Sequence, residues 1–277
     1  LSILQVLPAF CFFIFLFVSW ILNITEPVFL FAGRSISFLT AGILFAYFVI
    51  FKYLKLQNIK LQNIKGMYQK DFKLYFQMTL GNLFNRGVFY IPTLLVSKYF
   101  GIIEAAQYGI MLQFCMMPMS FVSIAVGKVY HGYLASLVRG VSLESLNRNR
   151  IKLILLVITL VFCFGTLVII PLVLTYGFEG NWGGAIQYIK IMTPAFAANI
   201  FVSPLASAFF VFKLGNVAVI GRAVWLTGVL TAFYLAIYYN NLVIGLIGFS
   251  IITTFVMIGF YIISENILKK WELNDNK

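Results

Sequence analysis

One arginine lies deep inside an apolar stretch of this sequence, with polar residues around it at helical spacing. Arg86 is near the middle of the apolar segment 75–98, about 12 residues, or roughly 18 Å of helix, from Lys98 at the end of that segment. A guanidinium offers a planar fork of donors that matches phosphate oxygens. Spacings of three and four place the following residues on one helical face: Thr79, Asn82, Arg86, Tyr90, Thr93 and Ser97.

This face would be costly toward lipid, so we expect it to line a hydrated cavity that attracts anions. Asn85, and Gln113 on the next apolar segment, would extend the cavity wall. Lys190 either supports the bound anion or snorkels to the membrane surface, and Arg34 has the same two options. The alternative for Arg86 is a structural arginine that is hydrogen-bonded to helix carbonyls.

The apolar segments contain no mid-segment Asp or Glu, which argues against a carboxylate site for protons or cations. The sequence also lacks a Ser/His/Asp arrangement, a zinc-protease motif, a P-loop and a dinucleotide-binding turn. We therefore expect neither an enzyme nor a bound cofactor or metal. A coupling ion remains possible, without any residue to identify it.

The composition predicts an all-α integral membrane protein. Of the 277 residues, 62% are hydrophobic and 10% are charged, against roughly 25% charged in a soluble domain. The net charge of +12 does not indicate a nucleic-acid partner, because Lys and Arg lie in short gaps between apolar runs. A crossing helix needs about 20 apolar residues, which gives about eight spans: 3–22, 32–52, 75–98, 106–128, 151–174, 186–212, 217–238 and 242–264.

The charged residues in the gaps predict the orientation. Sixteen of the 20 basic residues lie in alternate gaps or after the last span, whereas the intervening gaps contain Glu26, Glu104 and Glu179. Cytoplasmic loops are the basic ones, so both ends of this chain are expected in the cytoplasm. Pro194 and Pro204 predict a kink or tilt in the long span 186–212.

The longest basic gap contains the tandem repeat LQNIK-LQNIK at residues 56–65. Its alternation of Leu and Ile with Lys predicts either a short amphipathic segment on the anionic inner leaflet or a duplicated, tolerated linker. Either way, the repeat separates two spans before it from six after it.

Two stretches resemble the Wzx-type polysaccharide flippases of bacteria. Residues 99–131 have a Phe-Gly turn, small residues with a Tyr, and a helix with a central Pro and a final Val-aromatic pair. Residues 176–212 are similar to the family's Gly-x-x-Trp-x-x-Ala turn, which leads into a helix with Pro and Ser-Pro-Leu. The matching residues are Pro118, Ala125, Gly127, Val129 and Tyr130 in the first stretch, and Gly177 or Gly180, Trp182, Ala185, Pro194, Ser203, Pro204 and Leu205 in the second.

The resemblance implies the fold of the multidrug/oligosaccharidyl-lipid/polysaccharide exporter superfamily, in which two six-helix lobes surround a cavity. Residues 1–52 would be the last two helices of the N-terminal lobe, 53–73 a basic cytoplasmic linker, and 74–277 a complete six-helix C-terminal lobe with a cytoplasmic tail. About four helices would then be absent, which fits a chain that begins with Leu1 rather than Met.

The implied activity is movement of a polyprenyl-pyrophosphate-linked oligosaccharide across the bacterial cytoplasmic membrane by alternating access. Arg86 would hold the phosphate with Lys190 in support, and Asn82, Asn85, Tyr90 and Gln113 would line the cavity. The expected partners are this substrate, membrane lipids and other polysaccharide assembly proteins.

Three alternatives remain. A multidrug exporter of the same superfamily would favour acidic cavity residues, which the missing helices would have to supply. A flippase for the peptidoglycan precursor would share the fold and the cationic cavity. A membrane polysaccharide polymerase or acyltransferase would need a large outer loop or a His/Asp pair near the surface, and neither is present.

The predicted orientation has a direct test. A cysteine introduced by Leu61→Cys should react with a membrane-impermeant thiol reagent only from the cytoplasmic side, because the basic gap is expected there. Labelling of intact cells from outside would overturn the orientation.

Overall fold

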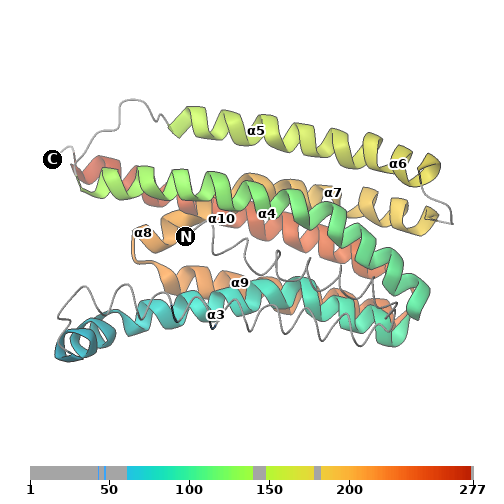
Figure 1. Cartoon of the computed structure of the whole chain (residues 1–277), viewed down its shortest axis with the longest axis horizontal. Coiled ribbons are helices and arrows are strands. Elements are labelled where there is room, and N and C mark those ends of the chain that lie inside the picture. Colours follow the sequence, from blue (N-terminus) through green and yellow to red (C-terminus); the bar gives the residue numbers. More distant parts are fainter. Residues whose placement is uncertain (1–42, 44–46, 48–60, 140–147, 178–181, 276–277) are drawn as a thin grey trace. The chain divides into compact units, whose positions relative to one another are not determined.

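The computed structural model describes residues 43, 47, 61–139, 148–177 and 182–275 (Figure 1). The chain divides into two units, Leu1–Asp71 and Phe72–Lys277, and most of the described residues belong to the second. The predicted span 3–22, Arg34 and the first LQNIK copy lie outside the described residues, as does the span 32–52 apart from positions 43 and 47.

Every regular element among the described residues is a helix, which confirms the all-α prediction. Five stretches are long and apolar enough to cross a membrane: Ile102–Val138, Arg148–Tyr176, Gly183–Val202, Gly215–Tyr238 and Leu242–Trp271. The protein is thus an all-α integral membrane protein. In chain order the helices are α3 (Leu61–Tyr99), α4 (Ile102–Val138), α5 (Arg148–Phe164), the π-helix η2 (Gly165–Ile169), α6 (Ile170–Tyr176), α7 (Gly183–Val202), the 3₁₀-helix η3 (Leu205–Ser207), α8 (Ala208–Val211), α9 (Gly215–Tyr238) and α10 (Leu242–Asp275).

The third predicted span, 75–98, is helical but is not among the five apolar stretches. It forms the second half of α3, whose first residues are the second LQNIK copy. The polar side chains on one face of α3 lower its hydropathy below that of the other long helices. This helix is therefore the least suited of the long described helices to face lipid on all sides.

Proline affects these helices unequally. Pro118 and Pro194 lie inside α4 and α7 without interrupting them. Pro171 follows the π-helix η2. The wider turn of a π-helix leaves space for the proline ring, which would otherwise clash with a carbonyl of the preceding turn.

The predicted span 186–212 is not a single kinked helix. It is divided into α7, η3 and α8, and the division falls at Ser203 and Pro204. Pro204 lacks the N–H that would continue the helical bonding, and the chain re-forms a short helix only after a 3₁₀ turn. Of the two prolines expected to kink this span, only Pro204 marks an interruption.

The core of the second unit forms around α7, which packs against α4, α5 and α10, while α10 also packs along α9. Phe89 of α3 is 3% exposed and contacts aromatic rings from three other helices. Its ring centroid lies 5.9 Å from that of Phe196, 5.7 Å from that of Trp225 and 6.0 Å from that of Phe249. This cluster joins α3 to α7, α9 and α10.

Close approach of α9 and α10 depends on glycine. A Cβ atom at Gly248 would lie 2.6 Å from the Cβ of Ala232, and one at Gly245 would lie 2.8 Å from the Cβ of Ala236. Small residues at such contacts let membrane helices pack backbone to backbone, where dispersion forces rather than water exclusion hold them together.

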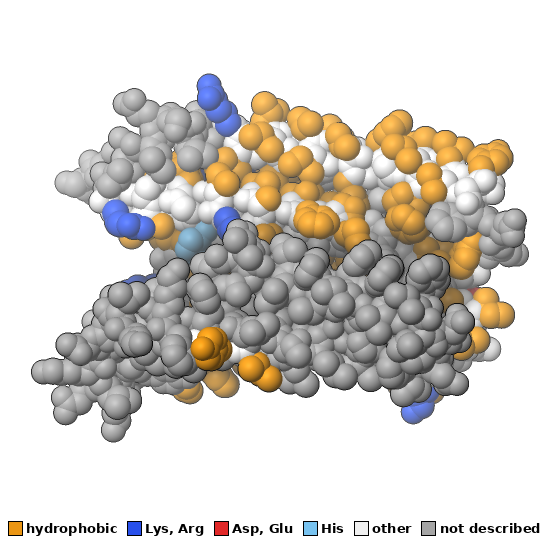
Figure 2. Space-filling view, in the orientation of Figure 1, with side chains coloured by type: hydrophobic (Ala, Val, Ile, Leu, Met, Phe, Trp, Pro, Cys, Tyr) orange, Lys and Arg blue, Asp and Glu red, His pale blue; other side chains and the backbone are white. Residues whose placement is uncertain are grey.

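The surface of the second unit is apolar along the length of its helices. Large exposed side chains on α5 include Leu153, Leu160 and Val161, and Figure 2 shows the hydrophobic covering on the visible face. The ends of α4 and α10 and the starts of α5 and α9 lie at one end of the second unit (Figure 1). The helix ends next to the predicted basic gaps after α4 and after α8, and the end of α10, thus meet at the same end of this unit.

Phe89→Ala should destabilise the protein by about 3–5 kcal/mol, because it leaves a void among three aromatic rings. The measurement is reversible unfolding in detergent. The matched control is Phe121→Ala on α4, where the ring is 69% exposed, and it should change the unfolding free energy by no more than about 0.5 kcal/mol. Equal effects of the two substitutions would contradict the packing described for α3.

Candidate functional site

The polar stripe predicted on α3 lies on a face that the second unit leaves exposed. Asn82, Arg86 and Tyr90 are all exposed, and the Tyr90 side chain is 60% exposed. On the side of the same helix that packs against the bundle, Val88 and Val96 are fully buried. The helix therefore turns an apolar face to the bundle, and its exposed face combines the polar stripe with large apolar side chains such as Leu83 and Leu94.

Within this stripe the guanidinium of Arg86 makes no hydrogen bond or ion pair with any residue that the structure describes. In particular, it does not bond to a helix carbonyl of the described chain. The Thr93 hydroxyl, one of the other members of the stripe, donates to the carbonyl of Phe89 at 3.0 Å and is half-buried. The N–H donors of Arg86 therefore have no acceptor in the described part of the chain.

The other predicted cavity residues are not gathered around Arg86 by any contact in the described chain. Asn85 is half-buried on α3, Gln113 is exposed on α4, and Lys190 is exposed on α7. None of the six predicted residues lines the cavities between α3 and α9, among α4, α5, η2 and α7, or between α9 and α10. Their roles therefore remain predictions.

A second guanidinium, that of Arg222, lies beside the polar stripe, and it was not predicted from the sequence. Arg222 is one of the 16 basic residues that were counted with the alternate gaps, where it flanks the gap before the span 217–238, but it lies in the second turn of α9 and is only half-exposed. Its Nη1 atom donates to Oδ1 of Asn82 at 3.4 Å. Its position could have indicated a site residue, because Arg222 lies five residues inside the predicted span 217–238, between the small residues Gly221 and Ala223.

Two features fit Arg222 against α3. A Cβ atom at Gly81 would lie 2.7 Å from Nη1 of Arg222, so the missing side chain makes room for the guanidinium. The guanidinium also lies over the ring of Phe210, 5.6 Å from its centroid. One turn closer to the start of α3, Gln77 donates to the side-chain oxygen of Asn216. This end of the α3–α9 interface is therefore polar.

Comparison with known proteins does not assign this site. No family model, curated protein or solved structure matches the chain. Only the chemistry of the described residues therefore bears on the function of this site.

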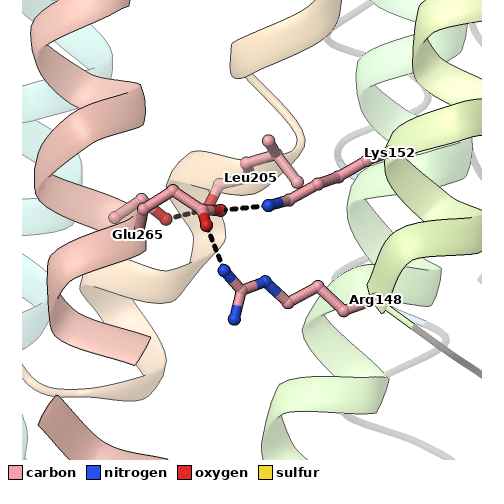
Figure 3. A network of polar contacts seen from close by, with 5 residues as sticks. Arg148, Lys152, Leu205 and Glu265 are labelled. Atoms are coloured by element: carbon pink, nitrogen blue, oxygen red, sulfur yellow. Dashed lines mark hydrogen bonds and ion pairs between the residues drawn. The ribbon is translucent and has the colours of Figure 1, made fainter. Parts of the chain in front are cut away.

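The described carboxylates are already engaged at the ends of the bundle. Figure 3 shows Glu265 of α10 between two cations of α5: Arg148 donates to Oε2, and Nζ of Lys152 lies 2.8 Å from Oε1. Lys152 also lies 5.5 Å from the centroid of the Tyr261 ring. Near the other end of the bundle the Tyr188 hydroxyl donates to Glu104, which joins α7 to α4.

Arg148 pairs with Glu265 whereas Arg150 is exposed, so the two arginines should contribute differently to stability. Arg148→Gln should lower the unfolding free energy by about 1–2 kcal/mol, because it removes one partner of the mostly buried Glu265 carboxylate. The carboxylate would still be paired with Lys152. The matched control is Arg150→Gln, which removes the same charge from an exposed position two residues along α5 and should have an effect below about 0.5 kcal/mol. Equal losses in thermal or chemical unfolding would show that the ion pair does not stabilise the fold.

Proposed function

We propose that this chain belongs to a transporter of the Wzx type, which moves polyprenyl-pyrophosphate-linked oligosaccharide across the bacterial cytoplasmic membrane. The observation that supports the proposal most is the exposed guanidinium of Arg86 on the polar stripe of α3, which has no partner among the described residues. A cation at that depth is tolerable only beside water, protein dipoles or an anion.

The chemistry of this face suits each part of such a substrate. The guanidinium presents two parallel N–H donors to phosphate oxygens, which makes it a better diphosphate ligand than an ammonium group. Tyr90 and Asn82 offer an aromatic surface and an amide to sugar hydroxyls. The apolar side chains Leu83 and Leu94 are 64% and 70% exposed on the same helix and would lie beside the lipid tail.

Alternating access explains why one unit leaves a polar face uncovered. In a two-lobe transporter each lobe packs its own core and turns a polar wall toward the cavity between the lobes. The helices from α3 to α10 would form one lobe, with α3 as part of its cavity wall. Rocking of the two lobes would then expose Arg86 to the cytoplasmic and the outer side in turn.

The proposal extends to orientation and partners. The end of the bundle where the basic gaps meet would face the cytoplasm, with both ends of this chain on that side. The substrate would come from membrane-bound glycosyl transfer and pass to other polysaccharide assembly proteins. A multidrug exporter is less well supported, because Glu104 and Glu265 are engaged near helix ends rather than placed on the polar face of α3.

Arg86→Ala in the whole protein should lower surface polysaccharide by about 10-fold or more while the protein persists in the membrane, since a charge-assisted hydrogen bond contributes about 1.5–3 kcal/mol. Arg86→Lys should restore part of the activity, because an ammonium keeps the charge without the fork. The assay is polysaccharide formation in a strain that lacks its own transporter.

Lys98→Ala provides the control, because it removes an exposed cation from the outer end of the same helix. It should leave polysaccharide near the wild-type level. Wild-type polysaccharide from Arg86→Ala would end the proposal.

A further inference from the structure

Arg222 is held beside the polar face of α3 by weak contacts only. Its hydrogen bond to Asn82 is 3.4 Å long, beyond the 2.7–3.2 Å typical of such bonds, and it uses one of five N–H donors. The contact with the Phe210 ring neutralises no charge. No carboxylate pairs with Arg222 within the described chain, where the ion pairs are those of Glu265.

Arg222 contacts α3 at Asn82, which is one turn from Arg86. Asn82 and Arg86 are four residues apart on one helical face, so they are separated by one turn, or roughly 6 Å of rise. Arg222 reaches Asn82 from α9, and Arg86 extends from the next turn of α3. Two cations without anionic partners among the described residues thus meet α3 one turn apart, on a face where Asn82 and Tyr90 are also exposed.

We propose that Arg222 and Arg86 together form a diphosphate site, in which Arg222 exchanges its bond to Asn82 for phosphate oxygens. This inference rests on the proposed function and adds a ligand from α9 and a preference for diphosphate over monophosphate. Arg86 binds one phosphoryl group and Arg222 the other, and each guanidinium can donate two parallel hydrogen bonds. The long bond to Asn82 is a resting contact that the ligand replaces at little cost.

Gly81 is part of this site because it leaves space for Arg222. A side chain there would meet Nη1 of Arg222 at 2.7 Å, and only the flexible end of the arginine would have to move. The residue therefore offers a way to displace the guanidinium while its charge and the helix packing are kept.

The experiment measures equilibrium binding of farnesyl pyrophosphate, farnesyl monophosphate and inorganic pyrophosphate to the purified whole protein in detergent. Arg222→Gln should weaken binding of farnesyl pyrophosphate at least about 10-fold and should reduce the preference for diphosphate over monophosphate. Inorganic pyrophosphate should lose affinity in parallel, which would identify the diphosphate rather than the isoprenoid chain as the group that Arg222 binds.

Arg139→Gln is the matched control, since it removes an exposed arginine at the end of α4 and should bind all three ligands as the wild type does. Gly81→Ala should weaken farnesyl pyrophosphate binding with an unchanged thermal unfolding temperature. This second variant tests the site even where Arg222→Gln fails to fold.

The outcomes separate the two proposals. Wild-type affinity and wild-type diphosphate preference in both Arg222→Gln and Gly81→Ala would overturn the role of Arg222. If Arg86→Gln still weakens binding in that case, the proposed function stands without this inference. If Arg86→Gln also binds farnesyl pyrophosphate normally, both proposals fail.

Discussion

The hydrocarbon interior of a membrane offers no water, so each polar group of a crossing helix needs a partner within the protein. Most of the described chain obeys this constraint. The Thr166 hydroxyl donates to the carbonyl one turn earlier, and the carboxylates of Glu104 and Glu265 are held by Tyr188 and by two cations. Arg86 is a charged exception, because its guanidinium has no partner among the described residues. That exception is the basis of the functional argument.

The rest of the bundle explains how α3 can keep one face uncovered. Phe89 fixes the helix in the aromatic core through Phe196, Trp225 and Phe249, so the opposite face need not contribute to packing. At the polar end of the interface, Gly81 admits a guanidinium from α9. In the proposed transporter, stability and ligand binding would thus depend on different faces of one helix, and a change on the polar stripe would alter binding without opening the core.

The length of the apolar runs was enough to predict the all-α membrane fold and the approximate spans from 106 onward, because a bilayer requires about 20 apolar residues per crossing. The same signal cannot distinguish Pro194, which a continuous helix tolerates, from Pro204, which ends one. It also cannot reveal that Glu265 pairs with Arg148, since the two are 117 residues apart. Arg222 was missed because a charge near a span boundary was assigned to the loop.

In the proposed transporter, the polar stripe of α3 meets water inside the membrane rather than lipid. Labelling of single cysteines in native membranes by a small hydrophilic thiol reagent tests it most directly, in a background without the native cysteines. We expect rapid labelling at Asn82→Cys and Tyr90→Cys and slow labelling at Leu156→Cys and Leu160→Cys on the apolar surface of α5, although all four positions are exposed. Equally slow labelling at all four positions, or faster labelling at the two leucine positions, would contradict it.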